Sequence, residues 1–228
     1  MQPVKPFFDL FLDSNLIHLK ARTSTLENLS DKLSNDGYAV LDDFLPISDF
    51  KKILVRFEEL KQEEEFNKAG IGKQISYEID KAVRGDFIRW IDENDHTAPT
   101  APLFNFIQQL VEHLNRTCFI GIKDFESHYA FYPPGRGYAT HRDRFKNNAH
   151  RLISFVFYLN NSWKQADGGY LMLYNEALET IKKIEPIGNR IAFFMSETLH
   201  EVTECHEERR SITGWLLDQP KGVTFINL

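Results

Sequence analysis

The feature that most constrains the fold is a change in hydrophobic pattern near residue 119. Before it, apolar residues recur at helical spacing in three stretches, at 25–36, 48–60 and 103–114. After it, short apolar segments are separated by turn signals such as Pro133-Pro134-Gly135 and Asp167-Gly168-Gly169. Helices followed by closely spaced strands predict an α+β protein, in which helices pack on one face of a β-sandwich or barrel.

The strands can be placed approximately from their β-branched and aromatic residues. The predicted strands are 38–41, 124–132, 138–143, 152–159, 170–174, 190–194, 201–203 and 210–217. The apolar stripes of the predicted helices are interpreted as core, without a cofactor role.

Size and charge limit the class of protein. The 228 residues suffice for one domain with a substantial core. The net charge is -6 and the pI is near 5.8, so the chain does not show the excess of basic residues that is typical of a nucleic-acid binder. No apolar run reaches the length of a membrane span, and the first residues do not resemble a signal peptide. We therefore expect a cytoplasmic protein without nucleic-acid or membrane partners, in which Cys118 and Cys205 are ordinary reduced thiols.

A candidate metal site begins at the end of one predicted strand. His141 and Asp143 are two residues apart, so an extended chain would direct an imidazole and a carboxylate to one point. His200, in a distant strand, would complete a two-His, one-carboxylate site with open positions, as in non-heme Fe(II) oxygenases. A His-x-Asp triplet alone occurs close to chance frequency. The prediction therefore depends on the residues around it.

The last predicted strand supplies those surroundings. Its polar and aromatic residues share one face: Arg209, Ser211, Thr213 and Trp215. A buried arginine on that face needs an anion, which a guanidinium binds through two parallel hydrogen bonds. Arg210 is the alternative, but only one of the two neighbours can face inward. The pattern favours Arg209, because Arg210 shares its face with the apolar Ile212 and Leu216.

With these motifs the chain resembles the Fe(II)- and 2-oxoglutarate-dependent dioxygenases, and among them the prolyl 4-hydroxylases like those that modify hypoxia-inducible factor, together with their bacterial relatives. The resemblance runs from about residue 70 to 218. It is carried by Arg84-Gly85-Asp86-x-Ile88-x-Trp90, Tyr132-Pro133 with Gly135 and Gly137-Tyr138, His141-x-Asp143, Tyr158-Leu159-Asn160, Gly168-Gly169, Phe193-Phe194, His200-Glu201-Val202 and Arg209-x-x-Ile212-Thr213-x-Trp215.

The resemblance implies a double-stranded β-helix, or jelly roll, with supporting N-terminal helices. Residues 1–228 would form a single catalytic domain: a mainly helical layer at 1–118 that includes the first strands and a substrate-side loop, the jelly-roll core at 119–218, and a tail at 219–228. It also implies Fe(II) at the three candidate ligands, and 2-oxoglutarate and O2 as co-substrates that are converted to succinate and CO2. Ascorbate would serve as reductant.

The resemblance gives roles to other residues. Arg209, nine residues beyond His200, would bind the distal carboxylate of 2-oxoglutarate. Further residues on the co-substrate side are Tyr158, Tyr132, Thr213 and Trp215. The alternative for the two tyrosines is a core position bonded to backbone.

Three expectations concern the substrate side. Asp86 and Arg151 would pair near the substrate mouth, or else form an ordinary surface ion pair. Arg142, Arg144, Lys146 and Arg151 give a local positive charge, which either belongs to a solvated loop or favours an acidic stretch of a target protein. Residues 66–79 are either a surface loop or a loop that closes over a protein substrate.

The expected activity is hydroxylation of a prolyl residue in a protein. Because bacterial relatives in the family act on a translation elongation factor, a component of the translation machinery is a candidate partner. The alternatives are hydroxylation of another side chain or of a small molecule, and a non-catalytic jelly-roll module that only binds ligands.

Overall fold

In the described part of the chain, all three long helices lie before residue 119, with short strands between them, and the chain after residue 119 is mainly strands, as the sequence predicts. The structure is a computed structural model that describes residues 23–69, 84–92, 95, 99–144 and 149–221. The helices are residues 23–36, α2 (Ile47–Gln62), α3 (Ala101–Cys118) and a short 3-10 helix (Gln165–Asp167). None of the helices in these described ranges combines the length and the apolar character that a membrane span requires.

The strands form two antiparallel sheets. Their bounds are β1 (Tyr38–Leu41), β2 (Asn67–Lys68), β3 (Phe87–Ile91), β4 (Asp124–Tyr132), β5 (Arg136–His141), β6 (Arg151–Tyr158), β7 (Leu171–Tyr174), β8 (Thr180–Ile184), β9 (Ile191–Met195), β10 (Leu199–Cys205) and β11 (Arg209–Leu217). The larger sheet has the order β1-β9-β6-β11-β4-β3-β2, and the smaller sheet has the order β5-β10-β7-β8.

The larger sheet buries both of its faces, because alternate residues of its central strands serve two cores. Ile153, Phe155 and Phe157 of β6 are fully buried in the core that also contains the helices. Val156 and Tyr158 point the other way and pack against residues of β7 in the smaller sheet. The two-residue period of a strand thus places one side of β6 under the helices and the other inside the barrel.

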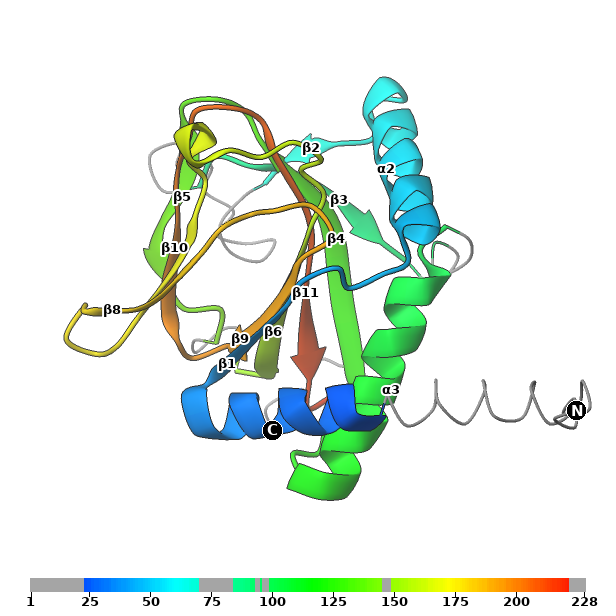
Figure 1. The fold of residues 1–228 in the computed structure, drawn as a ribbon, viewed down its shortest axis with the longest axis vertical. Coiled ribbons are helices and arrows are strands. Elements are labelled where there is room, and N and C mark those ends of the chain that lie inside the picture. Colours follow the sequence, from blue (N-terminus) through cyan, green and yellow to red (C-terminus); the bar gives the residue numbers. More distant parts are fainter. Residues whose placement is uncertain (1–22, 70–83, 93–94, 96–98, 145–148, 222–228) are drawn as a thin grey trace, which may run out of the picture.

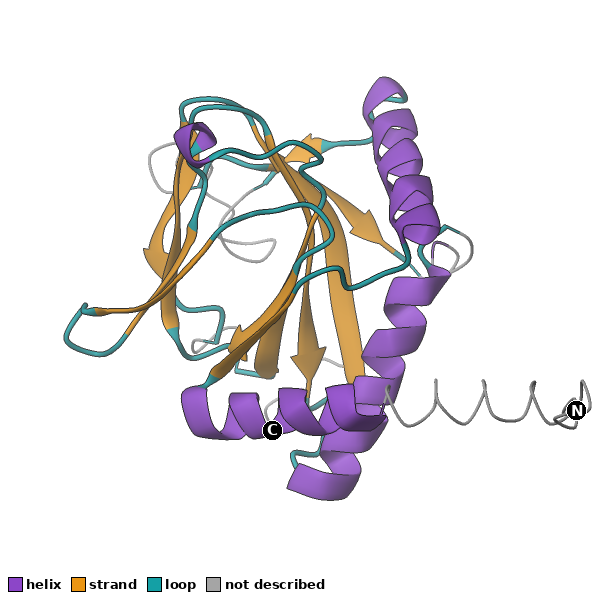
Figure 2. Ribbon diagram, in the orientation of Figure 1, coloured by secondary structure: helices purple, strands orange, loops and turns teal. Residues whose placement is uncertain are grey.

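The helices cover the outer face of the larger sheet. Helix α2 buries Phe50, Ile53, Phe57 and Leu60 at helical spacing. Asp49 in its first turn and Lys61 in its last turn suit the helix dipole. In Figures 1 and 2, α2 and α3 lie on one side of β4 and β11, whereas β5 and β10 lie on the opposite side. The site is therefore built between two sheets, one of which the helices support.

The predicted α+β architecture is confirmed, and the strands predicted at 38–41 and 124–132 coincide with β1 and β4. β2, β3 and β8 were not predicted. β8 contains two lysines and is exposed over four of its five residues, so it has no apolar alternation to detect. The predicted 66–79 loop includes β2, and residues 70–83 lie outside the described residues, so its closure over a substrate remains a prediction.

Candidate active site

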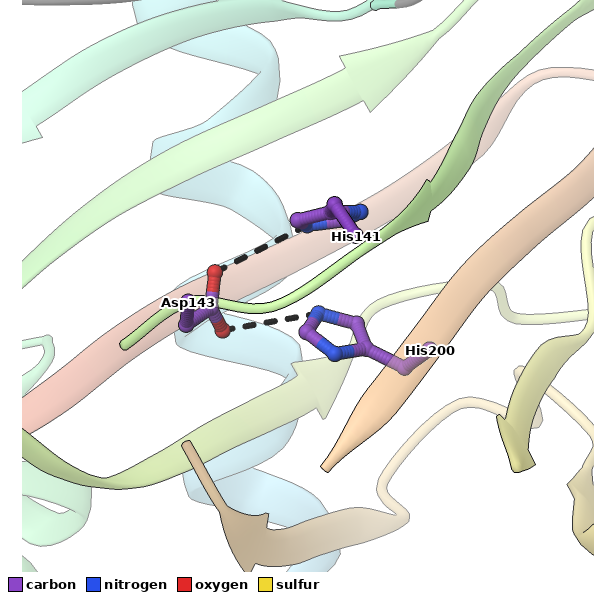
Figure 3. Close-up of side chains that lie close together, drawn as sticks. All are labelled: His141, Asp143 and His200. Carbon is purple, nitrogen blue, oxygen red and sulfur yellow. Dashed lines mark ion pairs between the residues drawn. The ribbon is translucent and has the colours of Figure 1, made fainter. Parts of the chain in front are cut away.

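The three predicted metal ligands meet at one end of the smaller sheet. His141 ends β5, His200 is the second residue of β10, and the two are paired across the antiparallel strands. Asp143 follows His141 by two residues. One ligand atom from each side chain lies within 4.8 Å of the other two. Figure 3 shows the two imidazoles directed at opposite oxygens of the Asp143 carboxylate.

The distances between the three side chains leave room for a metal ion that all three could bind. His141 Nε2 lies 3.7 Å from Asp143 Oδ1, and His200 Nε2 lies 3.5 Å from Asp143 Oδ2. These separations are too long for hydrogen bonds but suit three donors around one ion with bonds of about 2 Å. Asp143 and His200 are buried, whereas His141 is partly exposed.

Backbone carbonyls hold both imidazoles in one tautomer. His141 Nδ1 lies 2.8 Å from the Ala139 carbonyl oxygen, and His200 Nδ1 lies 2.9 Å from that of Thr198. Because a carbonyl only accepts, each Nδ1 carries the proton and donates it. Each Nε2 is then left with a lone pair for a metal. The hydrogen bond from Nδ1 to the backbone carbonyl fixes the orientation of each ring.

Electrostatics keep His200 and Asp143 in their metal-binding forms. Burial lowers the pKa of His200 to about 4, although Asp143 opposes this shift, so the ring is neutral at pH 7. Burial works to raise the pKa of Asp143, but the neighbouring His200 and His141 outweigh it and hold that pKa well below its usual range. The carboxylate is therefore ionised at neutral pH.

Arg209 lies inside the barrel, and Arg210 lies outside it. Only 4% of Arg209 is exposed, and its Nε donates to the Gly169 carbonyl oxygen at 2.9 Å. Arg210 instead pairs with Glu208 and with Glu58 of α2. Within the described part of the chain, Arg209 has no carboxylate within 4.0 Å. A buried guanidinium without a protein anion is a site for an anionic ligand.

Two predicted tyrosines surround this guanidinium. Arg209 Cζ lies 5.2 Å from the ring centroid of Tyr132 and 5.1 Å from that of Tyr158. The Tyr158 hydroxyl is buried and has no hydrogen-bond partner among the described residues. Burial raises the pKa of Tyr158, and Arg209 opposes this rise, so the phenol is neutral and can donate. The alternative of a core tyrosine bonded to backbone is therefore not what the structure contains at Tyr158.

The other two predicted co-substrate residues lie along the same strand. Thr213 is partly buried, and its hydroxyl lies 3.4 Å from that of Ser211. Trp215 is buried with its indole Nε1 unpaired in the described structure. Arg151 covers the Trp215 ring, with Cζ 3.4 Å from the ring centroid.

The predicted pairing of Asp86 with Arg151 is wrong. Asp86 is buried, and the guanidinium of Arg84 binds both of its oxygens, at 2.7 and 3.0 Å. Arg151 instead donates two hydrogen bonds to Glu126 Oε1. The sequence could not reveal this exchange, because the register between β4 and β6 is set through β11 and brings Glu126 beside Arg151.

Acidic partners neutralise most of the predicted positive patch. Arg142 Nη2 lies 2.7 Å from Glu176, and Arg144 Nη1 lies 3.8 Å from Glu197. Arg151 is paired with Glu126 as described above, and Lys146 lies outside the described residues. Because these arginines already have acidic partners in the protein, the structure favours a solvated surface with ion pairs over a binding surface for an acidic target.

Sequence reasoning missed several residues that touch the site. Tyr138 stacks on His141 with ring centroids 3.6 Å apart, and Arg84 lies over the Tyr138 ring. His128 is buried, and its ring contacts those of Trp90 and Trp215. Tyr138 and His141 are three residues apart in β5, so regular strand alternation would place them on opposite faces and does not predict their contact; the pairing of β5 with β10 is irregular.

Comparisons with known proteins agree with this geometry. A family model described as the 2OG-Fe(II) oxygenase superfamily matches residues 127–217. A prolyl-4-hydroxylase from Pseudomonas putida, known from a crystal structure, is 32% identical in sequence to this chain. The match covers 85% of this chain and 99% of that one, with a TM-score of 0.76. The chain belongs to the 2OG-Fe(II) oxygenase superfamily. Its fold is the jelly roll of these structural neighbours.

Two further proteins, both named prolyl hydroxylases, are similar over most of this chain. A prolyl hydroxylase from Trichoplax adhaerens, solved with a peptide fragment of the hypoxia-inducible-factor oxygen degradation domain, is 28% identical over 88% of this chain and 92% of that one, with a TM-score of 0.79. The hypoxia-inducible factor prolyl hydroxylase of Caenorhabditis elegans is 29% identical over 85% of this chain. The alignment spans only 28% of that relative's length, and 48–61% of the three Egl nine homolog 1 proteins of rat, mouse and human.

The residues of this oxygenase fit the groups that its superfamily implies. Two imidazole nitrogens and one carboxylate oxygen are the facial donor set of a non-heme Fe(II) site. The guanidinium of Arg209 and the unpaired Tyr158 hydroxyl suit the distal carboxylate of 2-oxoglutarate. Phe194 connects the two sites, since its ring lies 4.7 Å from His200 and it packs in one cluster with Tyr158.

Proposed function

We propose that this oxygenase hydroxylates a prolyl residue of a protein, using Fe(II), 2-oxoglutarate and O2. The observation that carries the proposal is the presence, in one barrel, of a buried His-Asp-His set and a buried arginine without a protein anion. The choice of proline is supported by the names of the Pseudomonas putida and Trichoplax adhaerens proteins, both of which this chain aligns with over most of their length.

Each residue of the site has a defined task. His141, Asp143 and His200 hold the metal through two neutral Nε2 atoms and an ionised carboxylate. Arg209 binds and orients the distal carboxylate of 2-oxoglutarate, and Tyr158 donates a hydrogen bond to it. When bound, Fe(II) supplies the oxidative chemistry that couples conversion of 2-oxoglutarate to succinate and CO2 with hydroxylation. The apolar cluster of β6, β7 and β9 keeps water away from the anion.

The first test is made without oxygen. Adding 2-oxoglutarate to the Fe(II)-loaded protein should produce a visible absorption band that His141→Ala abolishes. Arg209→Ala should still bind Fe(II) but should need roughly a hundredfold more 2-oxoglutarate, because the charge-assisted pair contributes about 2–3 kcal/mol. Arg210→Ala is the matched control, since that arginine pairs with Glu208 and Glu58 on the outer surface, and should behave like the wild type.

The second test separates an enzyme from a binding module. In air, the wild type should convert 2-oxoglutarate to succinate, slowly without substrate and faster with a proline-containing protein that gains one oxygen atom by mass spectrometry. A band without any succinate would indicate a module that binds the co-substrate without turnover. Oxygen on a residue other than proline would keep the oxygenase chemistry and overturn the prolyl assignment.

Three finer parts of the proposal concern partner, reductant and location. A translation elongation factor is the first protein substrate to test, on the ground of the resemblance to bacterial relatives. Ascorbate is the proposed reductant, which predicts that it prolongs turnover in a coupled assay. A cytoplasmic location is proposed from the composition, and fractionation of cells tests it.

A further inference from the structure

Asp143 is the one metal ligand that no strand holds. Strand β5 ends at His141, and Asp143 lies two residues beyond it, so the hydrogen bonds of the sheet do not fix its backbone. His141 and His200, by contrast, lie in paired strands and have backbone carbonyls behind their rings. Something else must fix the direction of the carboxylate.

Two fully buried serines lie behind this carboxylate. Ser154 is in β6, and its hydroxyl donates to Asp143 Oδ2 at 2.7 Å. Ser196 follows the end of β9, and its hydroxyl oxygen lies 2.9 Å from that of Ser154. Neither serine has any exposed surface. The two hydroxyls and the carboxylate therefore form a line that solvent does not reach.

The direction of the hydrogen bonds in this line follows from chemistry. A carboxylate that binds a metal is deprotonated and offers only acceptors, so the Ser154 hydroxyl is the donor to Asp143 Oδ2. Ser154 has one hydroxyl proton and uses it on Asp143, which leaves only its oxygen for Ser196. Ser196 must then donate to Ser154. Donation from Ser196 strengthens the bond that Ser154 makes to the carboxylate, because consecutive hydrogen bonds polarise one another.

Ser196 is also tied to the backbone on both sides of the line. Its amide donates at 3.0 Å to the carbonyl oxygen of Leu152, which lies in β6 two residues before Ser154. Its own carbonyl accepts from the amide of Arg144 at 2.8 Å, one residue after Asp143. Ser196 thus links β6 to the loop that carries Asp143. Its backbone amide bonds to β6, its backbone carbonyl bonds to the loop, and its hydroxyl bonds to Ser154.

We propose that Ser196 and Ser154 are positioning residues for the metal, which hold Asp143 Oδ2 and leave Oδ1 as the single carboxylate oxygen that binds the ion. The inference rests on the proposed iron site and adds to it the residues that set how Asp143 binds. A carboxylate that can rotate offers either oxygen or both, whereas a fixed one presents one oxygen and keeps the remaining positions open.

The proposal predicts weaker and altered metal binding when the line is cut. Mn(II) alone serves as the probe, and its affinity is measured from the free-ion signal in electron paramagnetic resonance, without 2-oxoglutarate or oxygen. Ser154→Ala should weaken Mn(II) binding about tenfold to a hundredfold, the usual cost of losing a hydrogen bond to a metal ligand. Ser196→Ala should weaken it less, because Ser154 can still reach Asp143.

Two further variants separate positioning from general stability. Ser154→Thr keeps the hydroxyl and should recover most of the affinity. Ser127→Ala is the matched control, because Ser127 is a buried serine of the same sheet that lies on β4 and is not among the groups around the metal; it should bind Mn(II) like the wild type. The Co(II) absorption spectrum supplies a second readout, since a second carboxylate oxygen on the ion would change the intensity of its visible bands in Ser154→Ala.

The outcomes also separate this inference from the proposed function. If Ser154→Ala binds Mn(II) as tightly as the wild type and gives the same Co(II) spectrum, the inference is wrong, even where the wild type converts 2-oxoglutarate. Equal weakening by Ser127→Ala and Ser154→Ala would overturn it too, because the effect would then be one of stability. If the serine variants behave as expected while the wild type converts no 2-oxoglutarate, the positioning line stands and the proposed function fails.

Discussion

At the scale of single residues, the barrel interior holds polar atoms that the folded chain leaves unpaired. The hydroxyl of Tyr158, Nδ1 of His128 and Nε1 of Trp215 are buried without a hydrogen-bond partner among the described residues. Each such atom costs about 1–3 kcal/mol compared with a satisfied one. This cost is expected where a ligand will supply the missing partner, which is why proteins tolerate it at binding sites.

Tyr158→Phe tests this interpretation directly. Removing the hydroxyl should weaken 2-oxoglutarate binding about tenfold, because one hydrogen bond to a carboxylate is lost. The metal-free, ligand-free protein should be as stable as the wild type or more stable, since the lost group was unsatisfied. Titration calorimetry and urea unfolding measure the two effects.

Tyr170→Phe is the control for that prediction. The Tyr170 hydroxyl donates to the Gln165 carbonyl oxygen at 3.1 Å, so it is already satisfied by the protein. This variant should lose about 1 kcal/mol of unfolding free energy and keep its 2-oxoglutarate affinity. A stability loss in Tyr158→Phe equal to that in Tyr170→Phe would mean that the Tyr158 hydroxyl is satisfied in solution.

His128 should make the stability of the protein depend on pH. Burial, followed by the nearby Arg84, lowers the pKa of His128 to about 3, whereas an unfolded chain has about 6.5. Between these values the unfolded state binds the extra proton, so stability falls as the pH drops below about 6.5. The contribution approaches 1.4 kcal/mol per pH unit. The measurement is the unfolding free energy of metal-free protein, obtained from urea unfolding between pH 7 and 5. In His128→Leu this free energy should fall less steeply with falling pH than in the wild type, by up to about 1.4 kcal/mol per pH unit. An unchanged slope would contradict it.

At the scale of elements, the metal site depends on how closely β5 approaches β10. The pairing of these strands is irregular, with register shifts on both sides of Val202. Gly137 lies at the closest approach, where a Cβ atom would come within 2.5 Å of the Val202 carbonyl oxygen. Only a residue without a side chain lets β5 carry His141 to the same point as His200.

Gly137→Ala should therefore damage the metal site as well as the fold. The added methyl must push β5 from β10, which should cost about 1–3 kcal/mol of unfolding free energy and weaken Mn(II) binding severalfold. Gly214→Ala is the control, because its Cβ would meet the Glu126 carbonyl oxygen and the Phe155 ring at 2.5 Å, in the larger sheet. It should destabilise similarly and spare Mn(II) affinity; equal losses of affinity in the two variants would refute the role given to Gly137.

At the scale of the whole molecule, the helices and the barrel share one core. Residues of the helix at 23–36, of α2 and of α3 pack in the same cluster as β4, β6, β9 and β11. The outer face of the larger sheet would be exposed without the helices, since Phe155, Phe157 and Phe193 are fully buried there. Within the described residues, the helical layer and the barrel therefore belong to one packed unit.

A single core predicts a single unfolding transition. Circular dichroism reports mainly the helices, whereas tryptophan fluorescence reports the barrel, because Trp90, Trp163 and Trp215 lie within or between its strands. The two signals should give one midpoint in urea. Mn(II) at a hundred times its Kd should raise the unfolding free energy by about 2.7 kcal/mol in both, and His200→Ala should abolish this gain. Separate midpoints would mean that the helical layer folds apart from the barrel.

Local patterns in the sequence predicted the helical stripes, most strands, the choice of Arg209 over Arg210, and the three residues His141, Asp143 and His200 that the structure brings together. Each of these depends on local periodicity or on a motif of a few residues, and a strand's alternation fixes which neighbour faces inward. Other contacts appear only in the folded molecule: Arg84 rather than Arg151 binds Asp86, Tyr138 stacks on His141, and Ser154 and Ser196 lie behind Asp143. The contacts of Arg151 with Glu126 and the hydrogen bonds that link the two serines to Asp143 join separate strands and loops, whose registers have no local signature, so they follow from how the sheets pack.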